Sequence, residues 1–193
     1  MNPSEIRAIF KKSGALLSGH FQLTSGLHSD AYFQCAQVLQ WPTYARQLCG
    51  MAKDAFGGKE IETVIAPAVG GIVVGYEIAS QLKARSLFTE RQDGKMRLRR
   101  GFDIRPGERI LVAEDVTTTG GSVREVIQLA LAKGAEVVGV FVIVDRSNGA
   151  IDYGVPFISA LGMQVQTFIP EVCPLCAERV PIDKPGSRGI AKA

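Results

Sequence analysis

The chain has 193 residues, of which 46% are hydrophobic and 21% are charged, and its formal net charge is +3. This length and composition predict a single folded domain and exclude an intrinsically disordered chain. The small positive charge suits an enzyme of anionic substrates but is far below that of a typical nucleic-acid binder, and no run of about 18 apolar residues predicts a membrane span.

The first third of the chain predicts two helices separated by turns. Residues 4–17 carry apolar residues near helical spacing, with Ser4 as the N-cap. Residues 18–30 are rich in turn formers, and residues 41–56 again show a helical pattern. The first nine residues lack the basic and apolar regions of a signal peptide, so we expect a cytoplasmic protein.

Apolar strands and helices then alternate along the chain. The expected strands are residues 63–66, 85–89, 109–113, 137–144 and 157–161. Helical patterns over 71–82 and 122–132 lie between them, whereas residues 90–107 are polar and basic and predict a long loop or hairpin. This order predicts an α/β fold, with a five-stranded, mostly parallel sheet flanked by helices. Ligands of such sheets bind at the carboxyl ends of the strands.

Two acids and a run of small hydroxylated residues follow the expected strand 109–113. The segment consists of Glu114, Asp115, Val116, Thr117, Thr118, Thr119, Gly120, Gly121 and Ser122. Backbone N–H groups at a helix N-terminus bind phosphate, glycines allow close approach, and hydroxyl groups add donors. The two carboxylates can accept from ribose hydroxyls, directly or through Mg²⁺. The segment therefore predicts a ribose 5-phosphate site; the alternative is an acidic turn before an N-capped helix.

This segment resembles the signature for 5-phosphoribosyl 1-pyrophosphate (PRPP) in type I phosphoribosyltransferases. The resemblance implies that family's fold, a phosphoribosyl transfer reaction, and Mg²⁺ that enters with PRPP and has no firm protein ligand. It also implies that Glu114 and Asp115 are catalytic at the ribose and that residues 116–122 bind PRPP.

Residues 21–33 look like the N-terminal hood of orotate phosphoribosyltransferases. The hood of that family closes on the orotate ring, which implies that Tyr32 and Phe33 bind orotate. The alternative is a loop pinned by buried aromatic side chains. Thr24 stands where some members of the family have lysine.

A small-residue loop after the strand 63–66 is similar to the pyrophosphate-binding loop of the same family. It comprises Ala68, Val69, Gly70 and Gly71. Exposed backbone N–H groups in such loops bind anions. Many orotate enzymes carry a lysine where this chain has Gly70, so pyrophosphate binding falls to the backbone and to cations elsewhere.

Arg146 follows the strand 137–144 directly after Asp145. Orotate carries a carboxylate, which a guanidinium group binds in a bidentate pair. The resemblance places the orotate-binding arginine at Arg146 and its threonine partner at Thr118. The alternative is a surface Asp–Arg pair at a strand end.

The basic segment holds five cations between residues 91 and 100. In the family this loop closes over PRPP from the neighbouring subunit of a homodimer. Arg91 and Lys95 match its arginine and lysine at four-residue spacing, with Lys95 as the catalytic cation, and Arg97 replaces a histidine. Cations placed where charge develops on pyrophosphate lower the barrier, and closure excludes water.

The resemblance implies transfer of the phosphoribosyl group of PRPP to orotate, giving orotidine 5′-monophosphate and pyrophosphate for pyrimidine synthesis. The expected partners are these two small molecules and a second copy of the chain, without nucleic acid or membrane. We expect one domain over residues 1–193, with a helix and hood (1–40), a core (41–169) and a tail (170–193). The alternatives are a phosphoribosyltransferase for a purine or another base, and a non-catalytic PRPP-binding regulator.

Cys173 and Cys176 form a C-x-x-C pair, and the four cysteines of the chain are too few for a disulfide scaffold. A structural zinc site needs four ligands, and no second C-x-x-C pair exists. The missing ligands would come from Cys35, Cys49, His20 or His28, if these fold nearby. The alternatives are a zinc ion between subunits, a disulfide, a redox role, and a pair of cysteines that forms neither a metal site nor a disulfide. Residues 181–193 are rich in Pro, Gly and Lys and favour partial disorder.

Overall fold

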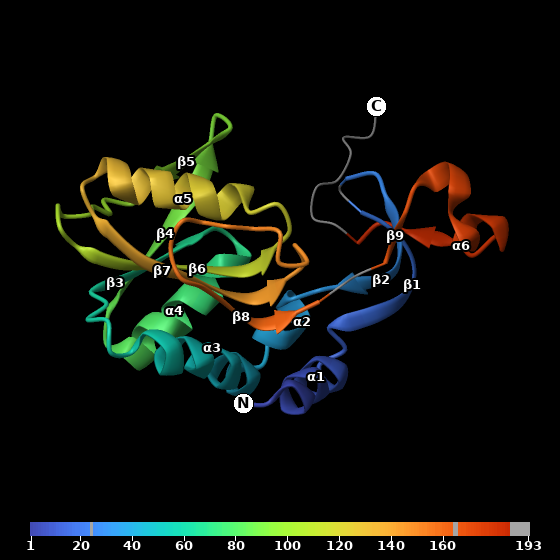
Figure 1. Ribbon diagram of the computed structural model, residues 1–193, viewed down its shortest axis with the longest axis horizontal. Helices are drawn as coiled ribbons and strands as arrows, with labels where there is room; N and C mark the ends of the chain where they lie inside the picture. The colour runs from blue at the N-terminus through green and yellow to red at the C-terminus, as the bar shows by residue number, and fades with distance from the viewer. Residues whose placement is uncertain (24, 164–165, 186–193) are drawn as a thin grey trace.

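A computed structural model describes residues 1–23, 25–163 and 166–185, which form two sheets with helices around them (Figure 1). The helices are α1 (Pro3–Lys12), α2 (Ala36–Leu39), α3 (Pro42–Phe56), α4 (Gly70–Leu82), α5 (Gly121–Ala132), the 3-10 helix η1 (Pro170–Val172) and α6 (Pro174–Ala177). The strands are β1 (Leu16–Gln22), β2 (His28–Phe33), β3 (Thr63–Pro67), β4 (Arg85–Gln92), β5 (Lys95–Leu98), β6 (Arg109–Thr117), β7 (Glu136–Asp145), β8 (Phe157–Gly162), β9 (Thr167–Phe168) and β10 (Ile182–Asp183).

The larger sheet has the strand order β5-β4-β3-β6-β7-β8. The five strands from β4 to β8 in this order are parallel, so the predicted α/β fold with a mostly parallel sheet is confirmed. A sixth strand, β5, pairs antiparallel with β4 because the basic segment forms a hairpin. Asp93 and Gly94 make its two-residue turn, both with positive φ, as tight hairpin turns require.

Helices cover both faces of this sheet, with α5 on one face and α3 and α4 on the other (Figure 1). Successive side chains of a strand point to opposite faces. Along β6, Leu111 and Ala113 join the core beneath α3 and α4, whereas Ile110 and Val112 join the core beneath α5. Because both faces are buried, the central strands are continuous apolar runs, and this explains why the sequence predicted them.

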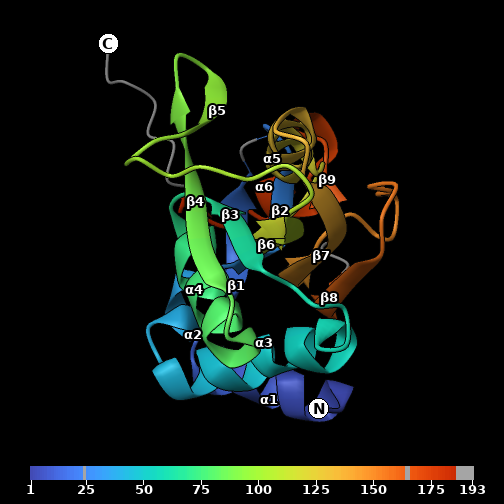
Figure 2. The ribbon, with the colours of Figure 1, turned by 90° about the vertical axis from the view of Figure 1, so that its left-hand side faces the viewer.

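The smaller sheet, called the hood sheet below, has the order β10-β1-β2-β9 and lies beyond the carboxyl ends of β6, β7 and β8 (Figures 1 and 2). The expectation of turns over residues 18–30 was wrong, because β1 and β2 form an antiparallel pair there. Their sequences are short and polar, and β9 and β10 come from the end of the chain. A pairing partner that lies more than 130 residues away leaves no local pattern to read.

The first helix differs from its predicted bounds at both ends. Asn2, and not Ser4, is the N-cap, and it forms a capping box with Glu5. The helix ends at Lys12, and Gly14 follows with a φ of 68°, a conformation that favours glycine. Leu16 therefore begins β1 and does not extend the helix.

The described helices include none that is long and apolar enough to cross a membrane. Part of the tail expected to be disordered, Ile182–Asp183, forms β10, and residues 186–193 lie outside the described ranges.

Candidate active site

A cavity of about 540 Å³ lies at the carboxyl end of β6, beside the N-terminus of α5. It is lined by residues of the hood sheet, of β4, of β6 and of α5: Ser25, Tyr32, Arg91, Glu114, Val116, Thr117, Thr118, Thr119, Gly120, Gly121, Ser122, Val123 and Glu125. The cavity is where ligands of parallel α/β sheets bind. It also unites the acidic and Thr/Gly segment with part of the hood, two features that the sequence could place only separately.

The loop between β6 and α5 is built to approach an anion closely. Gly120 is the N-cap of α5 with a φ of 79°, and a Cβ atom there would lie 3.0 Å from the hydroxyl of Tyr153. Within the described part of the chain, no side chain caps the first N–H groups of α5. These groups and the helix dipole therefore remain available for a phosphate. The Thr117 hydroxyl lies 2.8 Å from that of Tyr153, which fixes the base of the loop.

Glu114 and Asp115 are neighbours near the carboxyl end of β6, and neither pairs with a basic side chain among the described residues. Glu114 is 8% exposed. Burial raises the pKa of the Glu114 carboxyl well above its ordinary value, and the neighbouring Asp115 carboxylate raises that pKa further. Two adjacent carboxylates with no internal counter-charge suit a cationic ligand or ribose hydroxyls.

The glycines after β3 give these acids their space. A Cβ atom on Gly70 would overlap the Asp115 carboxylate, and one on Gly71 would lie 2.9 Å from a Glu114 carboxylate oxygen. Many relatives were expected to have lysine at position 70. The glycine found here leaves room for the Asp115 carboxylate. In the same loop the Ala68 N–H donates to the Thr89 carbonyl (2.8 Å), the Ala68–Val69 peptide is cis, and Val69 is exposed.

Arg146 holds an unused hydrogen-bond donor next to the hood. Its backbone N–H donates to the Thr117 carbonyl at 2.9 Å, which fixes it beside the phosphate loop. Its Nε atom is buried and has no hydrogen-bond partner within the described residues. Burial lowers the pKa of the guanidinium, and the nearby Tyr32 acts in the opposite direction. Tyr32 lines the cavity, whereas Arg146 is not among the described residues that line it.

The basic segment forms the hairpin of β4 and β5, called the basic hairpin below. It places Arg91 and Lys95 in different surroundings. Arg91 lines the cavity of its own chain and pairs with Glu125 on α5, with nitrogen–oxygen distances of 2.7 and 3.2 Å. Lys95 and Arg97 are exposed on β5, on a hairpin that extends past the body of the molecule (Figure 2). The structure therefore brings Arg91, but not Lys95, into the cavity wall.

The side chains of Tyr32 and Phe33, the two aromatic residues predicted to bind orotate, lie in different surroundings. Tyr32 lines the cavity, whereas Phe33 is 4% exposed and packs edge-on against Phe10, with ring centroids 4.9 Å apart. The interpretation as a buried aromatic anchor thus applies to Phe33. Thr24 lies outside the described residues.

Four residues at the site were not singled out by the sequence analysis: Ser25, Val123, Glu125 and Tyr153. Glu125 sits one helical turn after Gly121, on the side of α5 that faces the cavity, and this spacing was the available signal. Ser25 and Tyr153 come from a hairpin tip and a loop, where no periodicity marks the side that faces the site.

Residues 34–154 match the family model of the phosphoribosyl transferase domain. The match spans strands β3 to β7 of the larger sheet, the glycines after β3 and the loop between β6 and α5, so the chain carries a phosphoribosyl transferase domain.

Relatives that align over nearly the whole chain identify the family within this class. An orotate phosphoribosyltransferase of Desulforamulus reducens is 57% identical over 190 residues, which cover 98% of this chain and 100% of the relative. One of Pelotomaculum thermopropionicum is 56% identical with the same coverage. The crystal structure of orotate phosphoribosyltransferase from Aeropyrum pernix superposes with a TM-score of 0.72 at 25% identity, covering 82% of this chain and 93% of that one. This chain belongs to the orotate phosphoribosyltransferase family.

Proposed function

We propose that the protein transfers the phosphoribosyl group of PRPP to orotate, giving orotidine 5′-monophosphate and pyrophosphate. The observation that carries the choice of base is the buried Nε of Arg146, which lacks a partner among the described residues and directly follows β7 at the carboxyl end of the sheet. A buried donor without a partner is costly unless a ligand satisfies it. Orotate brings a carboxylate, the natural partner of a guanidinium, and purine bases bring none.

PRPP would bind with its 5-phosphate in the loop between β6 and α5. The N–H groups at the start of α5 and the hydroxyls of Thr117, Thr118, Thr119 and Ser122 are its donors. Thr118 also lines the cavity where the base would lie, in keeping with a second role beside Arg146.

Glu114 and Asp115 would act at the ribose. Breaking the bond from C1 to pyrophosphate leaves positive character on the sugar, and adjacent carboxylates stabilise it. Their hydrogen-bond acceptors also orient the ribose hydroxyls. The uncompensated charge of this pair fits Mg²⁺ carried in with PRPP, which would offset the charge of the pyrophosphate when bound.

Pyrophosphate would leave toward the loop from Ala68 to Gly71, with cations from the basic hairpin. Arg91 already stands in the cavity wall, and Lys95 is exposed on a hairpin that extends outward. Such a hairpin is suited to reach the site of a second copy, so we propose a homodimer with shared sites and Lys95 as the catalytic cation. We also propose that residues 1–193 act as one domain in the cytoplasm.

The experiment that tests this function follows orotate by ultraviolet absorbance in the presence of PRPP, with and without Mg²⁺. Hypoxanthine, adenine, xanthine and uracil are assayed in parallel. We expect Mg²⁺-dependent loss of orotate and no reaction of the other bases. Reaction of another base instead would contradict the assignment of Arg146. Binding of PRPP without turnover of any base would identify a regulator.

A further inference from the structure

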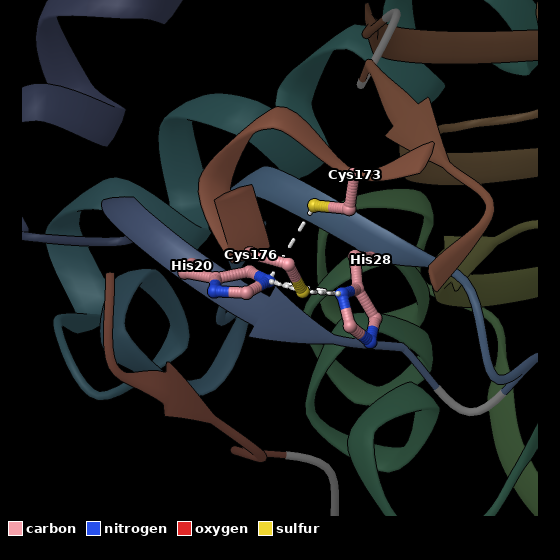
Figure 3. Close-up of side chains that lie close together, drawn as sticks. All are labelled: His20, His28, Cys173 and Cys176. Atoms are coloured by element: carbon pink, nitrogen blue, oxygen red, sulfur yellow. Dashed lines mark hydrogen bonds between the residues drawn. The ribbon is translucent and has the colours of Figure 1, made fainter. Parts of the chain in front are cut away.

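Four metal-binding side chains from three distant segments meet at the hood sheet (Figure 3). His20 lies on β1 and His28 on β2, and Cys173 and Cys176 flank the start of α6. Their ligand atoms all lie within 4.8 Å of one another. The C-x-x-C pair thus finds two histidines, whereas Cys35 and Cys49 are buried in the core and do not belong to the cluster.

The distances between the donor atoms are close to those around one tetrahedral ion. Zn–N bonds of about 2.0–2.1 Å and Zn–S bonds of about 2.3 Å imply N···N near 3.3 Å and N···S near 3.6 Å. The Cys173 and Cys176 sulfurs lie 3.6 and 3.7 Å from His20 Nε2, and the Cys176 sulfur lies 3.3 Å from His28 Nδ1. The two ring nitrogens are 2.9 Å apart, so a bound ion would require them to separate by a few tenths of an ångström.

The surroundings of His20 set its ring for coordination. Its Nδ1 lies 2.8 Å from the Val180 carbonyl, which can only accept, so Nδ1 carries the proton. In the neutral ring Nε2 is then a free lone pair, and it points at the other three donors. A ligating histidine whose second nitrogen donates to a backbone carbonyl is the usual outer-shell arrangement of protein metal sites.

Burial also points to a ligand. His20, His28 and Cys173 are 3%, 7% and 3% exposed, and the exposed Cys176 leaves a path for an ion. Imidazole and thiol groups gathered on a small sheet offer less apolar packing than aliphatic residues would. Coordination of one ion by these four side chains would explain why they are grouped here.

We propose that His20, His28, Cys173 and Cys176 bind one Zn²⁺ in a structural site that fastens the C-terminal segment to the hood. Two nitrogen and two sulfur donors in a tetrahedral arrangement favour zinc, and four protein ligands leave no open position for catalysis. Each thiol loses its proton on binding, so the two thiolates balance the charge of the ion. The site is independent of the transfer reaction proposed above.

The position of the site gives it a mechanical consequence. His20 and His28 stand near the turn of the β1–β2 hairpin, and this turn carries Ser25 into the cavity. Beside them, β10 pairs with β1 at His20 and β9 pairs with β2 at His28. The ion would lock both tail strands to the turn end of this hairpin, and its loss would loosen the hood before the core.

Metal analysis of the full-length chain without a histidine tag, purified under reducing conditions from zinc-containing medium, tests the site. We expect about one zinc per chain in the wild type, and below a tenth of that in Cys176→Ser. Cys176 is exposed, so this change removes a ligand without opening the core. Cys49→Ala is the matched control, because it removes a buried thiol outside the cluster and should retain the zinc.

Cobalt substitution gives a second readout that does not depend on activity. We expect Co²⁺ to produce intense visible bands of a tetrahedral site and a near-ultraviolet thiolate band, and His28→Ala to weaken both. Hydrogen exchange should then show that removal of zinc speeds exchange in β1 and β2 by tenfold or more, with β6 and β7 unchanged.

Three results would overturn the proposal. One is a wild-type chain with four free thiols that holds neither zinc nor cobalt, in which case a hydrogen bond between the two histidines explains their contact. Another is a mass lower by two hydrogens, which indicates a Cys173–Cys176 disulfide. The third is equal loss of zinc in Cys49→Ala and Cys176→Ser, which indicates adventitious binding.

Discussion

The two ends of β6 carry buried glutamates with opposite surroundings. Before its first residue, Glu108 is 2% exposed and accepts hydrogen bonds from the Thr63 hydroxyl, from the Arg85 guanidinium (2.8 Å) and from the Arg105 N–H (2.8 Å). Burial by itself would raise the pKa of Glu108, but these hydrogen bonds and the charge of Arg85 bring it below its ordinary value. At the other end of β6, the pKa of Glu114 is raised.

We infer from this difference that the charge of Glu108 stabilises the fold, whereas Glu114 is placed to bind a ligand. At the amino end of β6 the chain supplies every partner that the carboxylate needs. At the carboxyl end it supplies a second carboxylate, an uncapped helix N-terminus and a guanidinium nitrogen without a partner among the described residues. The proposed binding of PRPP, Mg²⁺ and orotate would supply partners for these groups.

The largest effect is expected from Arg146→Ala, which removes the proposed carboxylate partner. Loss of a buried, charge-assisted pair costs about 4 kcal/mol, so kcat/KM for orotate should fall roughly 1,000-fold. Arg146→Lys keeps the charge without the planar fork and should lose less. Thermal unfolding should barely change, because the Nε atom has no partner in the described structure. Unchanged orotate turnover would contradict the proposal that Arg146 binds the orotate carboxylate.

Glu108→Gln tests the end that serves the fold. It leaves Arg85 without its carboxylate, and we expect a loss of roughly 2–3 kcal/mol in the free energy of unfolding, since Arg85 is half-exposed. The folded-state pKa of Glu108 is depressed, so this loss is present above about pH 4 and disappears as the pH falls through that pKa. Urea unfolding at pH 7 and at pH 3 measures it. Equal losses at the two pH values would contradict the assignment.

Gly70→Ala tests the space reserved for Asp115. A methyl group there must displace the carboxylate, and such overpacking costs about 1–3 kcal/mol. We expect kcat/KM for PRPP to fall roughly 10- to 100-fold. Gly58→Ala is the control, because a Cβ at Gly58 meets nothing within 4 Å and should leave turnover intact. Equal activity in the two variants would show that Asp115 has room to move.

Glu114→Gln should raise the stability of the ligand-free protein while lowering its activity. Because burial raises the folded-state pKa, the folded chain holds a proton that the unfolded chain loses above about pH 4. The wild type therefore loses stability as the pH rises from there toward the folded-state pKa, and the glutamine variant does not. The gain should be about 1 kcal/mol at neutral pH and vanish near pH 4. Calorimetry across this pH range measures the gain in stability. A variant less stable than the wild type at neutral pH would contradict the raised pKa of Glu114 and with it the contrast with Glu108.

The smallest effect is expected from Glu125→Gln. The Arg91 side chain is bound to Glu125 in the free protein, and the hydrogen bond from Arg91 lowers the pKa of that carboxyl. Removing the charge would free Arg91 and make the cavity less negative, so KM for PRPP should fall about two- to threefold. Both partners are more than a third exposed, so stability should change by at most about 0.5 kcal/mol. Steady-state kinetics at two salt concentrations checks this, and a higher KM would show that Glu125 itself assists binding.

Sequence reasoning located the parts of the molecule that are local. The central strands are apolar on both sides, and the segment from Glu114 to Ser122 holds two acids, three threonine hydroxyls and the start of a helix in nine consecutive residues. Each of these features is readable because its physical cause lies within a few residues. Arg146 was readable for the same reason, since it directly follows a strong strand.

The features that escaped depend on long-range pairing. The strands β1 and β2 form a local hairpin, but burial does not alternate along either strand, and their outer partners β9 and β10 lie far along the chain. The C-x-x-C pair was visible, but the choice among Cys35, Cys49, His20 and His28 required the fold. The side chain of Phe33 turned to the core and that of Tyr32 to the cavity, as neighbours on a strand must.

The strand order β10-β1-β2-β9 has a consequence for the growing chain. The central strands of this sheet leave the ribosome among the first residues, and their outer partners leave it among the last. Until then, β1 and β2 expose unpaired edges to the surrounding solution. We therefore expect ribosome-bound chains that stop before residue 167 to hold a protease-resistant core and a hood that is still open to cleavage.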